Sequence, residues 1–313
     1  MVRSNVVLLG PQRLHPTLNV AVDALGIRGR IATVTAGWEE REREDQELAA
    51  HLHGRTHNLL LYERAGDVFS HDPELRGGLR ACHEKLRKLQ ELYRVRLAHE
   101  MEAARELLRR EAQPGWNGLV EPEVRGAIEA LRRLDDEHTQ RVREVHVAFE
   151  REWKPASREH VARHRGELRE LLEGSTALCI AGGHVAILLA RLRLFGVLDL
   201  LREQPVIAWS AGAMALAERI VVFHDRTPQG PGDPEVFEVG LGAMAGVVPL
   251  PHADKRLDLG DRARLALFAR RFEPAICAAL WPRTRMDWRD GRWRAEPGTQ
   301  KLTSAGELAE VGS

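Results

Sequence analysis

The segment that decides the fold is Val206-Ile207-Ala208-Trp209-Ser210-Ala211-Gly212-Ala213. An apolar run with strand character ends at Ser210, and small residues then begin an alanine-rich helix. This order of strand, sharp turn and helix is typical of a nucleophile elbow, in which small neighbours leave the serine hydroxyl clear of the crowded turn. The helix also points its first backbone N–H groups towards any anion that forms there. A small-residue turn between a buried strand and a helix has the same pattern, so the rest of the chain must decide.

Strands and helices alternate on both sides of this segment. The apolar runs with strand character are 6–9, 31–35, 58–62, 177–181 and 206–209. Helices are predicted between them, over 18–25, 39–52 and 185–194. Short strands are expected near the C-terminus at 276–280, 285–288 and 292–295. The alternation predicts an α/β domain whose mostly parallel sheet is covered by helices on both faces.

The alternation stops between residues 72 and 155, where two long apolar stripes occur. In each stripe the apolar residues recur every three or four positions, which indicates one buried face on one helix. The first stripe contains Leu79, Cys82, Leu86, Leu89, Tyr93, Leu97, Met101, Ala104 and Leu108. The second contains Val124, Ile128, Leu131, Leu134, His138, Val142, Val145 and Phe149. We therefore expect a long antiparallel helical hairpin with a coiled-coil seam, inserted between two parts of the α/β domain at 1–71 and 156–313.

The composition argues against several kinds of partner. Lys plus Arg equals Asp plus Glu at 46 each, so there is no electrostatic reason to expect nucleic acid or an anionic membrane. The apolar runs are too short for a membrane span or a signal peptide. Three widely spaced cysteines, Cys82, Cys179 and Cys277, are typical of a reducing compartment. We expect a cytoplasmic protein without a cofactor.

A serine nucleophile needs a base, and the base needs an acid that orients it. Asp225 follows the apolar run 220–223, and His252 follows the apolar run 247–251. Both would lie at the ends of strands, where α/β folds place their sites. His224 is adjacent to Asp225, but neighbouring strand residues point to opposite faces, so at most one of them faces the site. We predict no metal site, because His252-Ala253-Asp254 has no second pair of ligands at suitable spacing.

Three segments resemble the dipeptidase E and cyanophycinase family of serine peptidases, which has the class I glutamine amidotransferase-like fold. The segments are Gly182-Gly183 before a helix, Trp209-Ser210-Ala211-Gly212-Ala213, and Gly240-Leu241-Gly242 leading to Pro251-His252. The resemblance implies that Ser210 is the nucleophile and His252 the general base. Asp225 matches the acidic member of the family's triad in its spacing after the serine.

The resemblance also implies a mechanism and a substrate. The backbone N–H groups of Gly183 and Ala211 would hold the oxyanion, and glycine allows the close backbone approach that this requires. Gly182 and His184 would lie on the substrate-binding side. His184 stands where the family usually has asparagine, and it is either a changed pocket contact or a harmless exposed substitution. We expect hydrolysis of short peptides, including aspartyl and β-aspartyl peptides, through an acyl-enzyme.

A different class of function stays open: a non-catalytic amidotransferase-like scaffold whose helical hairpin binds partners. Compact members of the family lack the hairpin, and we expect it to form homo-oligomers. A pocket sealed by the hairpin would favour the scaffold, whereas the presence of all three triad residue types favours the hydrolase. Glutamine amidotransfer is disfavoured, since that chemistry uses a cysteine and Ser210 occupies the elbow.

Overall fold

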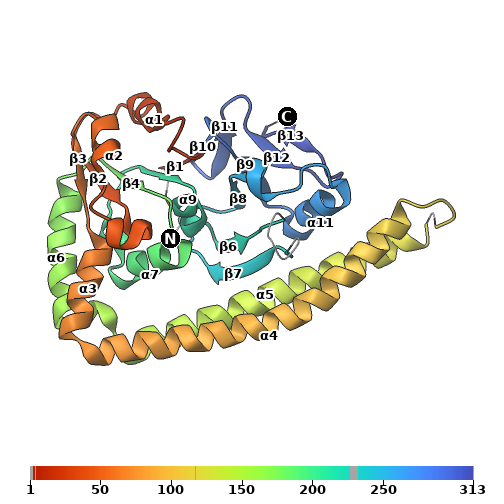
Figure 1. Ribbon diagram of the computed structural model, residues 1–313, viewed down its shortest axis with the longest axis horizontal. Helices are drawn as coiled ribbons and strands as arrows, with labels where there is room; N and C mark the ends of the chain where they lie inside the picture. The colour runs from red at the N-terminus through yellow and green to blue at the C-terminus, as the bar shows by residue number, and fades with distance from the viewer. Residues whose placement is uncertain (1–2, 4, 117, 226–231, 313) are drawn as a thin grey trace.

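The computed structural model describes residues 3, 5–116, 118–225 and 232–312 (Figure 1). Within these ranges a seven-stranded sheet has the order β11-β10-β1-β5-β4-β2-β3. Its strands are β1 (Asn5–Leu9), β2 (Ile31–Val34), β3 (Thr56–Asn58), β4 (Ala177–Ile180), β5 (Val206–Trp209), β10 (Arg285–Arg289) and β11 (Arg292–Ala295). The strands from β1 to β3 in this order are parallel, and β10 and β11 add an antiparallel edge. The predicted α/β class with a mostly parallel sheet is confirmed.

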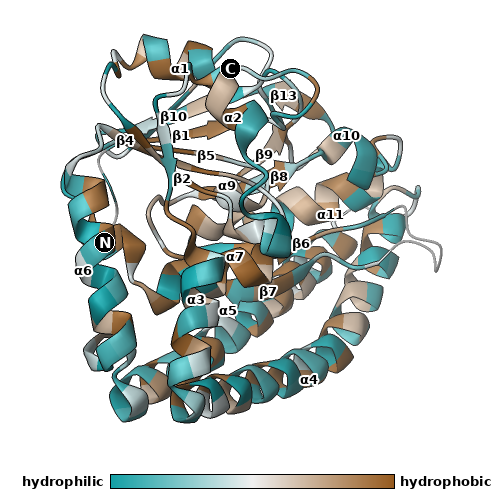
Figure 2. Cartoon of the chain, turned by 60° about the vertical axis from the view of Figure 1, so that its left-hand side comes forward, coloured by the Kyte–Doolittle hydropathy of each residue, from teal (hydrophilic) through white to brown (hydrophobic). Residues whose placement is uncertain are grey.

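Helices cover both faces of this sheet, as predicted. Every residue from Val6 to Leu9 is buried, because successive side chains of a strand point to opposite faces and both faces are covered. The strands at the centre of the sheet are accordingly apolar (Figure 2). One face packs against α3 (Leu61–His71), α6 (Glu159–Glu173), α7 (Val185–Leu194), α8 (Val197–Leu200) and α9 (Ala211–Leu216). The other packs against α1 (Leu18–Ala24) and α2 (Gln46–His51).

A second, smaller sheet lies beside the first and has the order β13-β12-β9-β8. Its strands are β8 (Val247–Pro251), β9 (Ile276–Leu280), β12 (Gln300–Leu302) and β13 (Leu308–Glu310). A separate antiparallel pair is formed by β6 (Arg219–Val222) and β7 (Glu235–Val239). The short helices α10 (Ala253–Arg256), η1 (Ala36–Arg41) and η2 (Pro155–Ser157) and the longer α11 (Arg262–Phe272) complete the domain. The strand expected at 276–280 is present, but it belongs to this second sheet.

The hairpin consists of α4 (Pro73–Glu111) and α5 (Val120–Trp153), which run together along one side of the molecule (Figure 1). Every member of the predicted stripe on α5 is buried. On α4 the stripe is buried from Tyr93 to Leu108, but Leu79, Cys82, Leu86 and Leu89 are only half-buried. Three of these four line a cavity instead of a continuous layer of side chains. Although α4 and α5 have 39 and 34 residues, no described helix has an apolar stretch that could cross a membrane.

The middle of the hairpin is joined to the domain by a buried ion pair. Arg271 of α11 donates to both carboxylate oxygens of Asp135 on α5, at 2.6 and 2.8 Å, and both side chains are 1% exposed. The Tyr93 hydroxyl of α4 donates to Asp135 at 2.8 Å and accepts from Arg271 at 2.8 Å and from the Val236 N–H at 3.1 Å. Arg271 also donates to the Pro234 carbonyl at 2.7 Å. One charged cluster thus connects α4, α5, α11 and β7, and only the end of the hairpin projects beyond the body (Figure 1).

This cluster stays charged although it is buried. Burial by itself lowers the pKa of Arg271, but the neighbouring Asp135 and Tyr93 oxygens more than offset it and raise that pKa above its ordinary value. Burial raises the pKa of Tyr93, so its hydroxyl keeps its proton and can donate. Every partner therefore has its hydrogen bonds, which is the condition under which a buried ion pair is tolerated.

Arg271→Met tests this cluster. The substitution leaves the Asp135 carboxylate buried without its cation, so we expect the free energy of unfolding to fall by about 3–5 kcal/mol. Urea denaturation followed by circular dichroism measures the change. Arg133→Met, at an exposed position on the same helix as Asp135, is the matched control and should change stability by less than about 0.5 kcal/mol. Equal losses in the two variants would contradict the role given to Arg271.

Candidate functional site

The carboxyl ends of β2, β4 and β5 bring three loops together. These strands are parallel neighbours in the sheet, so the segments that follow them emerge at the same edge. Gly37 follows β2, the pair Gly182-Gly183 follows β4, and Ser210 directly follows β5. The structure therefore places the predicted nucleophile, oxyanion loop and elbow helix at one point.

Ser210 has the backbone conformation of a sharp, strained turn. Its φ is 51° and its ψ −123°, a region that residues with a side chain rarely adopt. The turn is crowded on two sides. A Cβ on Gly182 would lie 2.7 Å from the Ser210 Cβ, and a Cβ on Gly212 would lie 2.4 Å from the Ile180 carbonyl oxygen. The small residues in the sequence pattern are therefore required by contact.

The loop that carries Gly183 is held equally closely. Gly183 has a φ of +118°, and a Cβ there would lie 2.2 Å from the Gly37 carbonyl oxygen. The same oxygen accepts a hydrogen bond of 2.8 Å from the His184 N–H. Within the described part of the chain, the N–H groups of Gly183 and Ala211 donate to no backbone oxygen. Both predicted oxyanion donors are therefore available to a ligand.

His252 reaches Ser210 from the second sheet. It follows β8 directly, has a φ of 57°, and donates its N–H to the Leu280 carbonyl at the end of β9, at 3.0 Å. Its Nε2 lies 3.4 Å from the Ser210 Oγ. This separation is at the long end for a hydrogen bond, as is common for catalytic pairs without a ligand. The structure thus brings together two residues that are 42 positions apart.

The charge state of His252 suits a base. Burial lowers the pKa of His252 below its ordinary value, and the cations Arg256 and Lys255 lower it further, while the Asp254 carboxylate opposes them. At neutral pH the imidazole is therefore uncharged. An uncharged ring can accept a proton from the serine hydroxyl.

Asp225 is a correction to the predicted triad. Its side chain is 1% exposed, and its two carboxylate oxygens accept from Arg264 Nε at 2.7 Å and from the Asp258 N–H at 2.9 Å. Its own N–H donates to the Arg256 carbonyl at 2.7 Å. No hydrogen bond joins Asp225 to His252 in the described structure. The carboxylate is committed to Arg264 and to the loop after α10, so it does not orient the imidazole here.

Asp254 was missed as a candidate. It lies two residues after His252 on α10, and its charge acts on the imidazole. Its Oδ1 is buried and has no hydrogen-bond partner among the described residues. The sequence pattern His252-Ala253-Asp254 resembles a metal-binding pair, but a carboxylate so near a base is also suited to stabilise an imidazolium.

His184 has a structural role that neither of its two predicted interpretations contained. Its Nδ1 accepts a hydrogen bond of 3.3 Å from the Ile187 N–H, so it caps the N-terminus of α7. Asparagine is a favoured residue at this position because its side-chain oxygen accepts the same bond. The ring is exposed, and Gly182 next to it is buried against the elbow.

A group of potential metal ligands lies away from these loops, on α3 and α6. Asp67, His71 and His160 have candidate ligand atoms within 4.8 Å of one another. The Asp67 carboxylate already accepts from His164 at 2.7 Å and from Arg163 at 2.5 Å. Both of these partners contact Oδ2, and Oδ1 lies 3.3 Å from His71 Nδ1, so the carboxylate is already in contact with its neighbours and we assign no metal to the group.

Comparison with known proteins adds little to this geometry. No protein-family model matches the chain, and no curated protein matches it. Among solved structures it is similar to the crystal structure of a peptidase from an acI-B1 Actinobacterium. The identity is 13%, the match covers 99% of this chain and 96% of the other, and the TM-score is 0.48. At that level the likeness carries no argument about activity, so the site must be judged by its own residues.

Gly182→Ala tests the crowding around the elbow. Gly182 has no positive φ, so alanine fits the backbone there, but its methyl group would lie 2.7 Å from the Ser210 Cβ. Displacing the nucleophile by a fraction of an ångström should lower its reactivity towards a fluorophosphonate about 10²-fold. Gly126→Ala, in open space on α5, is the control and should leave the rate unchanged. An unchanged rate in Gly182→Ala would show that the loop is looser than described.

Proposed function

We propose that the protein is a serine-type peptide hydrolase related in mechanism to dipeptidase E and cyanophycinase. The observation that supports this most directly is the approach of Ser210 Oγ to His252 Nε2, at 3.4 Å, in a turn with a strained serine. A serine is a weak nucleophile at neutral pH unless a base takes its proton. A half-buried, uncharged imidazole beside the hydroxyl would provide that base.

The reaction would proceed in two halves. In the first, His252 accepts the Ser210 proton as the oxygen attacks the amide carbon, and the N–H groups of Gly183 and Ala211 hold the oxyanion. The imidazolium then gives its proton to the leaving amine, and an acyl-enzyme remains. In the second half, His252 takes a proton from water, the resulting hydroxide attacks the ester, and Ser210 recovers its proton as the acid departs.

The charge near His252 supports an acidic substrate. Lys255 and Arg256 both lower the pKa of His252, so their positive fields reach the site. A negatively charged side chain on the substrate would be attracted to the same place. This favours aspartyl and β-aspartyl peptides among short peptides. The Asp254 carboxylate acts on His252 in the opposite sense and would stabilise the imidazolium.

Fluorophosphonate labelling tests the proposed chemistry. The parent should be labelled, Ser210→Ala should not be labelled, and His252→Ala should be labelled about 10²–10⁴-fold more slowly, because it lacks the base. The readout is in-gel fluorescence together with far-UV circular dichroism, which shows that each variant is folded.

Two carboxylate variants sharpen this test. Asp254→Asn should slow labelling, whereas a folded Asp225→Asn should retain it, since Asp225 binds Arg264 and not the imidazole. Slow labelling in a folded Asp225→Asn, together with retained labelling in Asp254→Asn, would restore Asp225 to the triad. Absence of labelling in a well-folded parent would count against the hydrolase.

The pH dependence of labelling has a definite sign. The imidazolium cannot accept a proton, so the rate is lost as the pH falls through the pKa of His252 in the folded protein. That pKa lies below its ordinary value of 6.5, so the rate at pH 6.5 should still be more than half of its maximum and the midpoint should lie in more acidic buffer. Lys255→Gln removes an exposed cation and should move the midpoint upwards. A parent midpoint at or above 6.5 would contradict the charge state given to His252.

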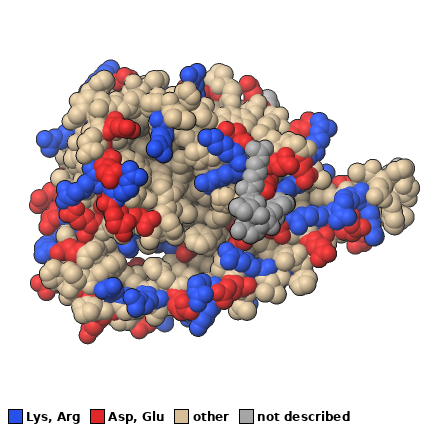
Figure 3. All heavy atoms as spheres, in the orientation of Figure 1, with Lys and Arg blue, Asp and Glu red and all other residues tan. Residues whose placement is uncertain are grey.

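A partner-binding scaffold is the second candidate, and one observation favours it. Of the described large apolar side chains that are exposed, several lie on the hairpin: Leu92, Val95, Trp116, Leu119 and Val147. Charged side chains of both signs are interspersed along its visible face (Figure 3). Such a mixed surface suits a protein partner or a second copy of this chain better than a nucleic acid.

A further inference from the structure

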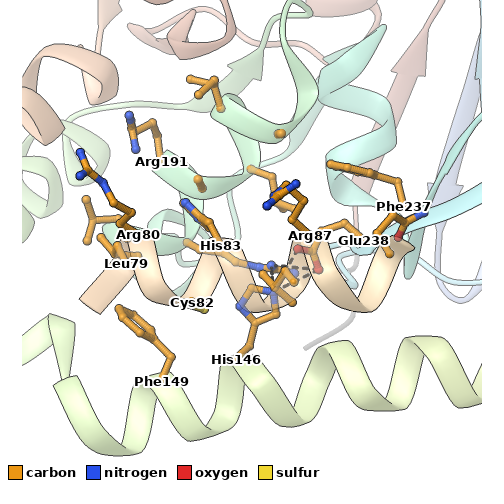
Figure 4. A pocket seen from close by; sticks show the side chains of 18 of the residues that line it. Leu79, Arg80, Cys82, His83, Arg87, His146, Phe149, Arg191, Phe237 and Glu238 are labelled. Atoms are coloured by element: carbon orange, nitrogen blue, oxygen red, sulfur yellow. Dashed lines mark hydrogen bonds and ion pairs between the residues drawn. The ribbon is translucent and has the colours of Figure 1, made fainter. Parts of the chain in front are cut away.

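A cavity of about 720 Å³ lies between the hairpin and the α/β domain. Its walls are α4 and α5 on one side and α7 and β7 on the other (Figure 4). The space-filling view shows a slit between the hairpin and the body above it (Figure 3). Neither Ser210 nor His252 lines the cavity, so it is separate from the candidate active site. The volume is in the range of small-molecule sites, roughly 300–1,000 Å³.

Much of the lining is apolar, with side chains from every wall: Leu79, Leu86, Phe149, Leu189 and Phe237. One group of charges in the lining is internally satisfied. Glu238 accepts from His146 at 3.1 Å and lies 3.4 Å from Arg193, with its side chain 11% exposed. Burial raises the pKa of Glu238, but these two neighbours offset it and hold that pKa below its ordinary value. This group therefore needs no ligand.

Arg191 of α7 is different, because its guanidinium has no polar partner. It forms no ion pair or side-chain hydrogen bond with any described residue, and its Nε is buried without an acceptor. The guanidinium lies over the rings of Phe69 and Tyr62, at 5.1 and 5.4 Å from their centroids. Burial lowers the pKa of Arg191, and the acids Tyr62, Glu42 and Glu39 oppose this only in part. Among the described residues this half-buried cation therefore has no carboxylate paired with it.

Three further charges of the lining are exposed and unpaired among the described residues, and two of the three are positive. Arg76 and Arg80 of α4 line the cavity and form no ion pair within the described residues. Figure 4 shows Arg80 and Arg191 on the same side of the view. Among the lining acids, Glu91 is paired with Arg87 at 2.8 Å, whereas Glu150 is unpaired within the described part of the chain and is exposed, as Arg76 and Arg80 are. The unpaired charges of the described lining are thus Arg76, Arg80 and Arg191 against Glu150, so an anion that enters the cavity would meet a surplus of positive charge beside the apolar side chains.

We propose that this cavity binds an anion carried on an apolar chain, such as a medium-chain carboxylate, with the carboxylate on Arg191 and the chain along the apolar lining. A planar guanidinium can bind a carboxylate through two parallel hydrogen bonds. The apolar chain would displace water from Leu79, Leu86 and Phe149 on the hairpin side. The ligand would then bridge the hairpin and α7, whose first residues follow the Gly182-Gly183 loop.

Isothermal titration of the full-length protein with decanoate tests the proposal. The parent should bind decanoate, and decanol and acetate should bind at least about tenfold more weakly, because each lacks one half of the recognised chemistry. Ser210→Ala should bind as the parent does, which separates this site from the proposed hydrolytic activity.

Variants locate the site. Arg191→Gln should weaken decanoate binding at least about tenfold, and Arg191→Lys should restore part of the affinity. Ala190→Trp, which fills the cavity from α7, should abolish binding. Arg169→Gln, at an exposed position on α6, is the matched control and should bind as the parent does. The proposal is wrong if the folded parent does not bind decanoate, if Arg191→Gln binds it as tightly, or if decanol binds equally well.

Discussion

The close contact of three loops around Ser210 is the constraint on which the site depends. Gly37, Gly182 and Gly183 approach one another and the serine so closely that a single methyl group on any of them would collide with backbone or with Ser210 itself. These contacts form because β2, β4 and β5 are adjacent and parallel, so their carboxyl ends meet. Contacts on several sides therefore hold Ser210 in its strained backbone conformation, and that conformation sets the direction of its hydroxyl.

The proposed base, His252, comes from a different part of the fold, and its placement depends on how the second sheet is attached. His252 follows β8, which pairs with β9 and packs against α9, the helix that begins after Ser210. The same sheet carries α11, whose Arg271 binds the hairpin through Asp135 and Tyr93. The hairpin is thus packed, through α11, against the sheet that carries His252, and it is not a separate arm along its whole length. Asp225 contributes to this framework through Arg264.

Much of this could be predicted from the sequence, because the patterns involved are local. The elbow is a contiguous segment, the α/β alternation follows from short apolar runs, and the stripe on α5 follows from a helical period. The apolar stripe predicted on α4 is fully buried only from Tyr93 to Leu108, because the first turns of the helix face a cavity that α7 and β7 help to form. No local pattern could show that Asp225 meets Arg264, which is 39 residues further along the chain. Nor could spacing alone separate Asp254 as an acid near the base from Asp254 as part of a metal pair.

The central claim is that Ser210 forms a covalent bond with the acyl group of a substrate. Rapid acid quench of the protein with an activated ester, followed by intact-mass and peptide mass spectrometry, tests it most directly. The account predicts one acyl group per chain, located on the peptide that contains Ser210, with accumulation that depends on His252. Turnover of the ester without an adduct on Ser210, or an adduct at another residue that persists in Ser210→Ala, would contradict it.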